Sequence, residues 1–121
     1  MSVVRFTAPP PGLEPATEFV LEPVPGAAGL FTLSSGETAA RLFVLDASVY
    51  LPDYAPRLAR TVLESVGLAA GVVPTVLVVA NPAAQTTVNL AAPIVLNPVS
   101  GACAQVILEG ADWPLRHPLA A

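Results

Sequence analysis

The side chains that could do chemistry in this 121-residue chain are a lone histidine, a lone cysteine and scattered carboxylates. His117 lies next to Pro118 and close to the C-terminus, so a catalytic triad or a metal site would have to be built around this one imidazole. A zinc site needs three or four His, Cys or carboxylate ligands, and no cluster with that spacing is visible. We therefore expect neither a metal ion nor a cofactor.

Cys103 alternates along a strand-like run with Gln105 and Ile107. A reactive thiolate needs nearby positive charge, and no basic cluster is close in sequence. A buried, inert thiol is the favoured interpretation. A small hydrolase-like enzyme remains an alternative only if folding brings Cys103 together with Asp53 and His117. No glycine spacing matches a phosphate-binding loop, so the sequence predicts a protein that is not an enzyme.

Residues suited to binding a protein partner are easier to find. Tyr54 follows Asp53 between Pro52 and Pro56, and an exposed tyrosine on a rigid turn is a frequent interface anchor. A ring packed over the mouth of a barrel explains Tyr54 equally well. Asp53 is also explained as the N-cap of a helix.

Asn89 and Arg116 are the other two candidates for partner contact. Asn89 precedes Pro93, which has no N–H to give to a strand ladder. The favoured role for the Asn89 amide is to satisfy backbone groups freed at that break, with a partner contact as the alternative. Arg116 follows Trp113. An interface that uses both side chains explains this pair as well as a buried Trp113 ring with Arg116 in an ion pair with a neighbour.

Composition limits the possible partners. The net charge is −4 and the five basic residues are scattered singly, so no basic stripe is available for direct binding of nucleic acid. An acidic surface would suit a basic protein partner, or it keeps the protein soluble. No run approaches the roughly 20 apolar residues that span a bilayer, and the N-terminus lacks the apolar core of a signal peptide. We expect a cytoplasmic protein without membrane contact.

The elements that must position these residues are short, because 14 prolines and 8 glycines interrupt the chain. The segment Thr86–Asn97 predicts a strand that bends at Pro93. One helix is expected from about Tyr54 to Val66, capped by Asp53. The other predicted strands are Val3–Phe6, Glu18–Val24, Leu30–Leu33, Arg41–Leu45, Thr75–Ala80 and Ala102–Glu109.

In the last of these strands, Ala104, Val106 and Leu108 are expected to face the core. About eight short strands, mostly adjacent in sequence, and one short helix indicate a mainly β single domain over residues 1–121. The expected architecture is a small antiparallel β-barrel-like fold, with a sandwich as the alternative.

Three motifs are similar to those of one known family. The run Thr87–Asn97, TVNLAAPIVLN, resembles the most recognisable motif of the flagellar assembly factor FliW. Asp53-Tyr54 and the terminal Arg116-His117-Pro118-Leu119 stand at the matching places. The resemblance covers about nine-tenths of the chain. The segment before Phe6 is shorter than the family's usual N-terminus, so a shortened first strand is expected.

What this resemblance implies is a small barrel-like binding protein without catalysis. Family members bind CsrA, a basic dimeric regulator that represses flagellin translation. They also bind flagellin in a chaperone-like way, and the two partners compete for the same protein, which acts as a switch between them. Asp53, Tyr54, Asn89 and Arg116 are the expected contact residues, and a monomer is the expected state. A structural subunit of a larger β assembly is a further alternative.

Overall fold

The computed structural model describes residues 2–36, 41–69, 71–82, 85–108 and 113–119. Two short helices accompany the strands in this part of the chain: α1 (Ala47–Tyr50) and α2 (Arg60–Ser65). The strands are β1 (Ser2–Phe6), β2 (Glu18–Pro23), β3 (Leu30–Ser34), β4 (Arg41–Asp46), β5 (Thr75–Asn81), β6 (Thr87–Val88), β7 (Ile94–Leu96), β8 (Ala102–Gln105) and β9 (His117–Pro118).

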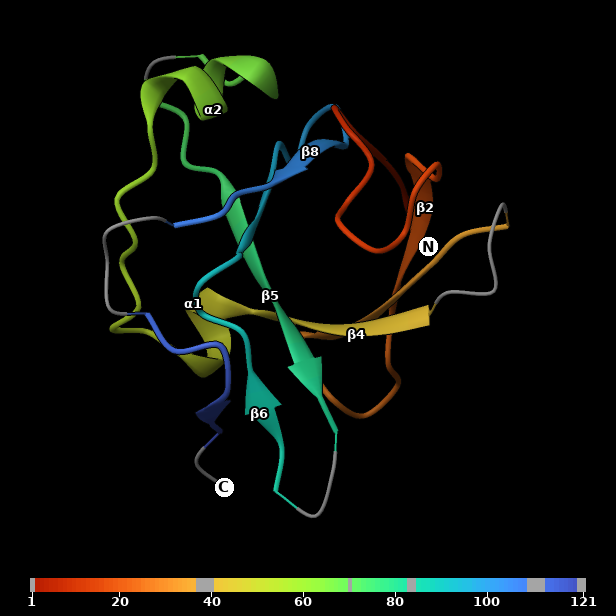
Figure 1. Ribbon diagram of the computed structural model, residues 1–121, viewed down its shortest axis with the longest axis vertical. Helices are drawn as coiled ribbons and strands as arrows, with labels where there is room; N and C mark the ends of the chain where they lie inside the picture. The colour runs from red at the N-terminus through yellow and green to blue at the C-terminus, as the bar shows by residue number, and fades with distance from the viewer. Residues whose placement is uncertain (1, 37–40, 70, 83–84, 109–112, 120–121) are drawn as a thin grey trace.

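Seven of these strands close into a barrel in the order β4-β3-β2-β1-β8-β7-β5, because β5 also pairs with β4 (Figure 1). The pairing of β1 with β8 is parallel, whereas the other barrel pairs are antiparallel. The prediction of a mainly β barrel is therefore confirmed, and closure leaves the barrel strands paired on both sides.

The bent segment predicted around Pro93 is present as two strands, β6 and β7. Both pair with β5, so β5 is the strand to which this whole segment is attached. The outer partner changes at the break: β6 pairs with β9 and β7 pairs with β8. Pro93 is fully buried in the interruption, and its carbonyl accepts a hydrogen bond from Val106 N–H at 2.9 Å.

The predicted helix from Tyr54 to Val66, capped by Asp53, is wrong over its N-terminal half. Helix α2 begins only at Arg60, and its N-cap residue Ala59 has extended backbone angles (φ −67°, ψ 144°). Proline disfavours the helical conformation in the residue before it, so Pro56 keeps Ala55 out of a helix.

The one carboxylate that does cap a helix lies earlier in the chain. The Asp46 side chain accepts a hydrogen bond from Ser48 N–H at 3.0 Å and so begins α1, which the sequence analysis did not predict. The described residues therefore contain two short helices, whereas one longer helix was expected.

The core is divided between the barrel interior and two outer clusters. In the interior, Phe6 and Phe19 meet edge to face at 5.3 Å. A second cluster lies under α1 and includes Val88, Leu90 and Tyr54. The third lies between β7, β8 and the α2 segment, around Val66, Leu68 and Val95.

Strand β8 corrects another expectation. It ends at Gln105, and the predicted end at Glu109 lies outside the described residues. Ala104 and Val106 do pack on a core cluster, the third one, as predicted, whereas Cys103 on the opposite face lies in the barrel interior. Successive residues of a strand point to opposite faces, and both faces of β8 are covered, so alternation alone could not tell interior from exterior.

Neither of the described helices is long and apolar enough to cross a membrane.

Candidate partner-binding site

Tyr54 joins three segments that are distant in sequence. Its hydroxyl donates a 2.6 Å hydrogen bond to the Leu90 carbonyl. Its ring meets Trp113 edge to face, with centroids 4.9 Å apart and an interplanar angle of 86°. Edge-to-face aromatic pairs contribute about 0.5–1.5 kcal/mol beyond their buried area. The 50–54 turn, the β6–β7 break and the C-terminal segment are therefore held together by one side chain.

Backbone hydrogen bonds reinforce this junction. The Leu90 N–H donates to the Pro114 carbonyl at 3.0 Å, and the Asn89 N–H donates to the Val79 carbonyl at 2.9 Å. Strand β9 continues the junction by pairing His117 with Val88. The Leu90–Pro114 bond and the β6–β9 pairing hold the C-terminal segment against residues 87–90, and the Asn89–Val79 bond holds the same residues against β5.

Asn89 has the structural role favoured from the sequence. Its side-chain oxygen accepts a 3.0 Å hydrogen bond from Ala91 N–H, within the break that precedes Pro93. The strand ladder does not reach this amide, so a side chain supplies its acceptor.

A surface hollow of about 340 Å³ opens where the three segments meet. We name it the Tyr54 hollow. Its lining is mostly apolar and aromatic and comes from all three segments: Tyr50, Leu51, Pro52, Asp53, Tyr54, Leu90, Trp113 and His117.

Two of the four residues predicted to contact a partner line this hollow, and the other two are chain neighbours of lining residues. Asp53 and Tyr54 line it, whereas Asn89 and Arg116 each precede a lining residue, Leu90 and His117. Asp53 and Arg116 are exposed and Tyr54 is half-buried. The Tyr54 ring packs over the second core cluster, outside the barrel interior, so it does not cover the barrel mouth, and it also lines the surface hollow. Its role as an interface anchor stays a prediction.

Sequence reasoning missed the other walls of the hollow. Leu90 is an ordinary member of an alternating strand, and nothing in its neighbourhood indicates that its carbonyl receives the Tyr54 hydroxyl. Trp113 was noted only as a partner for Arg116, yet its ring packs on Tyr54. Tyr50 lines the hollow from α1, which was not predicted.

The residues of the enzyme alternative are not grouped together. Asp53 and His117 line the Tyr54 hollow, but Cys103 lies in the barrel interior at 1% exposure. Burial raises the pKa of the Cys103 thiol to about 12, so the thiolate that a nucleophile requires is scarce at neutral pH. In the described part of the chain, no group of three or more His, Cys, Asp or Glu side chains could hold a metal ion.

Burial also changes the acidity of the central tyrosine. It raises the pKa of the Tyr54 hydroxyl to about 12, because the phenolate would lose solvation. Tyr54 is therefore a neutral hydrogen-bond donor across the physiological range, as its bond to the Leu90 carbonyl requires.

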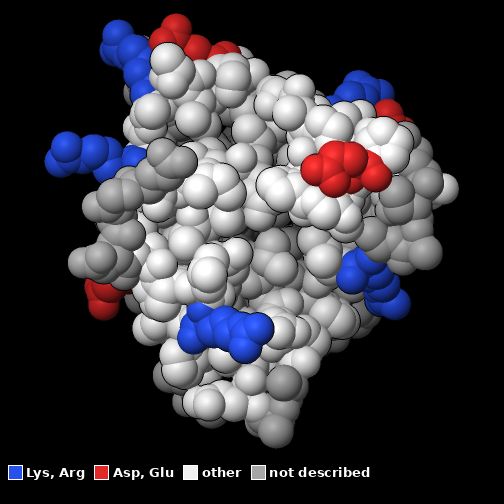
Figure 2. Space-filling view, in the orientation of Figure 1, with Lys and Arg blue, Asp and Glu red and all other residues white. Residues whose placement is uncertain are grey.

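On the face that Figure 2 shows, charged side chains lie singly or beside a charge of the opposite sign, with broad uncharged surface between them. The Arg5–Glu18 ion pair, at 3.1 Å, is exposed and joins β1 to β2, away from the Tyr54 hollow.

Fold and site together define a small closed β-barrel protein with an aromatic-lined depression where its C-terminal segment crosses the barrel wall. The family described as "FliW protein" matches residues 1–119. The chain therefore belongs to the FliW family.

Relatives and a solved structure agree with this assignment. The flagellar assembly factor FliW of Geobacillus kaustophilus is 30% identical over 120 residues, which cover 97% of this chain and 83% of that protein. The protein of the same name from Heliobacterium modesticaldum is 30% identical over 122 residues, covering 98% and 80%. A crystal structure of the flagellar assembly factor FliW superposes with a TM-score of 0.87 at 28% identity, covering 98% of this chain and 86% of that one.

Proposed function

We propose that this flagellar assembly factor binds the translational regulator CsrA and thereby relieves repression of flagellin translation, and that it also binds flagellin. The two partners compete for the free protein. When cytoplasmic flagellin is abundant it occupies the factor, and CsrA stays active on the message. When flagellin is exported, the released factor sequesters CsrA and translation resumes. Such a switch needs only differential occupancy of one binding protein.

One observation carries this proposal. The three motifs that resemble the FliW family, at Asp53-Tyr54, Asn89-Leu90 and Arg116-His117, are far apart in sequence but converge on the Tyr54 hollow. An aromatic-lined hollow with isolated charges on its rim is typical of a protein interface: apolar groups supply affinity, and charges supply orientation and association rate.

The net charge of −4 supports a basic first partner. Attraction between an acidic protein and a basic dimer raises the association rate and is screened by salt. In this proposal the protein acts in the cytoplasm as a monomer. A stable oligomer in size-exclusion chromatography with light scattering would instead favour the structural-subunit alternative.

Titration calorimetry of the purified protein with CsrA from the same bacterium, at low and moderate salt, tests the proposal. We expect saturable binding that weakens as salt rises, followed by release of CsrA when flagellin is added. A flat titration with a folded protein, at roughly 10–100 µM of each component, would remove CsrA as a partner. If flagellin also gave no heat, the whole binding function would be wrong.

A further inference from the structure

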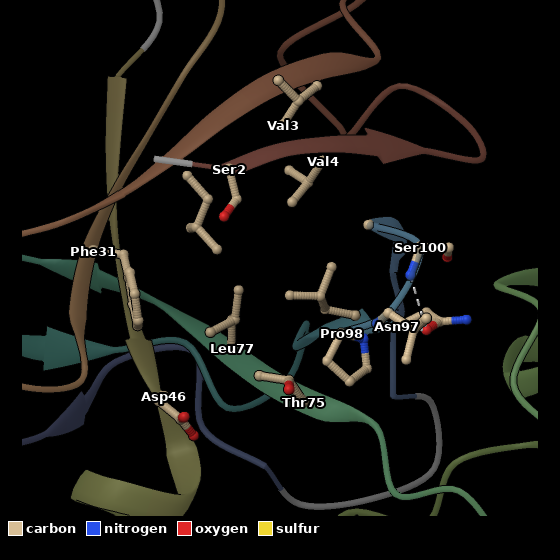
Figure 3. A pocket seen from close by; sticks show the side chains of 14 residues that line it. Ser2, Val3, Val4, Phe31, Asp46, Thr75, Leu77, Asn97, Pro98 and Ser100 are labelled. Carbon is tan, nitrogen blue, oxygen red and sulfur yellow. Dashed lines mark hydrogen bonds between the residues drawn. The ribbon is translucent and has the colours of Figure 1, made fainter.

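One end of the barrel interior opens to the surface as a hollow of about 380 Å³, which we name the barrel mouth (Figure 3). Its lining comes from β1, β2, β3, β4, β5 and β7 and from the 97–101 turn that follows β7. The barrel mouth shares no lining residue with the Tyr54 hollow. It is therefore a separate site, built by the barrel itself.

The strand register shows which side chains face into the barrel mouth. Asp46 of β4 pairs with Leu77 of β5, and Thr75 of β5 pairs with Leu96 of β7. Directly paired residues place their side chains on the same face of a sheet, and both leucines belong to the interior core cluster. Asp46 and Thr75 therefore face the inside of the barrel at its open end, where Figure 3 shows them on the same side of the hollow.

The floor of the barrel mouth is apolar. Val4, Leu21, Leu77 and Leu96 are all buried, and the Phe31 ring packs against the same interior cluster. Small closed barrels either fill their interior with side chains or hold one small ligand there. The volume lies in the range of ligand pockets and gives room for a molecule of roughly ten non-hydrogen atoms, at about 30 Å³ for each water-sized group.

Hydrogen bonds fix both walls of the barrel mouth. On one wall, the Asn97 side-chain oxygen accepts from Val99 N–H at 3.0 Å and from Ser100 N–H at 3.3 Å (Figure 3). On the other, Asp46 Oδ1 accepts from the Ser48 N–H at 3.0 Å and from the Ser48 hydroxyl at 2.7 Å. A pocket with ordered walls binds a ligand without the entropic cost of ordering them.

The charge of the barrel mouth defines its ligand. Asp46 carries the one charge among the described lining residues. Both hydrogen bonds from Ser48 reach Oδ1, and the ion pair in the described part of the chain joins Arg5 to Glu18, so Asp46 Oδ2 has no partner among the described residues. A carboxylate at the edge of an apolar hollow attracts a cation more strongly than one in open water does. The Thr75 hydroxyl offers a second acceptor on the same side.

We propose that the barrel mouth binds a small amphipathic amine, with one ammonium group at Asp46 Oδ2 and the Thr75 hydroxyl and an apolar body on Leu77 and Leu96. A polyamine is disfavoured, because its further ammonium groups would lie unpaired on the apolar floor. A fatty acid is disfavoured too, because its carboxylate would be repelled by Asp46. This site goes beyond the proposed function and does not depend on the binding of a protein partner.

Two probes of the same shape test the class of ligand. 3-Phenylpropylamine and 3-phenylpropan-1-ol have the same number of non-hydrogen atoms and differ in charge. In nuclear magnetic resonance titrations of the ¹⁵N-labelled protein, we expect the amine to bind with a Kd on the order of 1 mM and the alcohol to bind about five- to tenfold more weakly. The amide signals that move should be those of residues 2–4, 46, 75–77 and 96–101.

Two carboxylates provide a matched test of the charge. Asp46→Asn removes the charge and keeps an oxygen for the cap of α1, since asparagine and aspartate are equally good N-caps. Glu22→Gln removes the same charge from an exposed position of β2 outside the barrel mouth. The ratio of amine affinity to alcohol affinity should fall to about one in Asp46→Asn and stay at the wild-type value in Glu22→Gln. An unchanged ratio in Asp46→Asn would overturn the role of this carboxylate.

Two tryptophan variants provide a matched test of location. Ser2 pairs with Leu21 and so faces the barrel mouth, whereas Val20 is on the opposite face of β2. Ser2→Trp fills the hollow and should weaken amine binding by about tenfold or more, while Val20→Trp should bind as the wild type does. Circular dichroism checks that both variants are folded.

Three results would overturn the proposal in the wild-type protein. The first is the absence of saturable shifts at amine concentrations several times the expected Kd. The second is a set of shifts centred on residues 50–54, which would place the amine in the Tyr54 hollow. The third is equal affinity for the amine and the alcohol. In each case the calorimetry with CsrA is unaffected, so this proposal and the proposed function stand or fall separately.

Discussion

The Tyr54 hydroxyl and the Leu90 carbonyl, separated by 36 residues, are joined by a 2.6 Å hydrogen bond that holds the 50–54 turn against the break between β6 and β7. This bond lies under the Tyr54 hollow, so it links the stability of the barrel wall to the shape of the candidate site. The same ring also contacts Trp113, and the C-terminal segment depends on it as well.

Replacing Tyr54 with phenylalanine keeps the ring contact and removes the hydrogen bond. The partly buried Leu90 carbonyl loses its donor, so we expect the free energy of unfolding in urea to fall by about 1 kcal/mol. Tyr50→Phe is the matched control, since the Tyr50 hydroxyl donates to the Ala28 carbonyl at 3.0 Å in an exposed position. A loss in Tyr50→Phe as large as that in Tyr54→Phe would contradict the special role of Tyr54.

The titration of Tyr54 provides a second check. Its pKa of about 12 in the folded protein exceeds the ordinary value of 10.0, so the folded state holds this proton more tightly than the unfolded state does. The resulting stability is fully present below pH 10 and is lost as the pH rises from 10 to 12. Ultraviolet absorbance of Tyr50→Phe, which retains Tyr54 as its one tyrosine, should show phenolate formation centred near pH 12. A midpoint near 10 in the folded protein would show that Tyr54 is solvated.

The strands were largely predictable from sequence because alternation is a local property. Phe19 and Leu21 of β2 are buried as their spacing requires, and the change of partner at Pro93 follows from the missing N–H. The helix was misplaced because Leu58 and Val62 have helical spacing, although the backbone between Asp53 and Ala59 is not helical.

The site was only partly predictable, and the reason is physical. The Asp53-Tyr54 pair marked the correct turn, but the Tyr54 hollow exists because long-range pairing brings Leu90 and Trp113 to that turn. Periodicity cannot specify which carbonyl a hydroxyl reaches across the barrel wall. Helix α1, which brings Tyr50 to the hollow, depends equally on Asp46 ending β4 and capping α1, whereas the sequence suggested only that β4 ends there.

Cys103 should be inert in the native protein. The thiol is buried in the barrel interior and its pKa is raised to about 12 by that burial. We expect a thiol reagent such as dithionitrobenzoate to label less than a tenth of the protein at pH 7.5 within minutes, and to label it fully in urea. Rapid stoichiometric labelling without denaturant would mean that the barrel opens at β8.

Asn97 should matter more for stability than Asn89. Its buried amide donates to the Val66 carbonyl at 2.9 Å, and its oxygen accepts from Val99 N–H at 3.0 Å. Asn97→Ala removes the partner of the Val66 carbonyl at the end of α2 and of the Val99 N–H in the turn after β7, so the expected loss of unfolding free energy is about 2–3 kcal/mol. Asn89→Ala, which removes one hydrogen bond of 3.0 Å from Ala91 N–H, should lose about 1 kcal/mol in the same urea titration.

Barrel closure between β1 and β8 should depend on the absence of a side chain at Gly101. This residue has a φ of +82°, and a Cβ there would lie 2.8 Å from the Val3 carbonyl oxygen, an approach that no real side chain makes. The Gly101 carbonyl also accepts from Arg5 N–H at 2.9 Å, so the contact lies where the parallel pairing of β1 with β8 begins.

Gly101→Ala therefore combines two costs, the left-handed backbone and the clash with β1. We expect a loss of roughly 2–4 kcal/mol in urea unfolding and faster hydrogen exchange in β1. Gly12→Ala separates the two, because Gly12 has a φ of +86° but nothing within 4 Å of the added Cβ, so it should lose only about 1–2 kcal/mol. If both variants lost the same amount, backbone conformation alone would explain Gly101. If Gly101→Ala lost more stability than Gly12→Ala, and if hydrogen exchange became faster only in β1 and β8, the contact between Gly101 and Val3 would be the one that sets the parallel closure of the barrel.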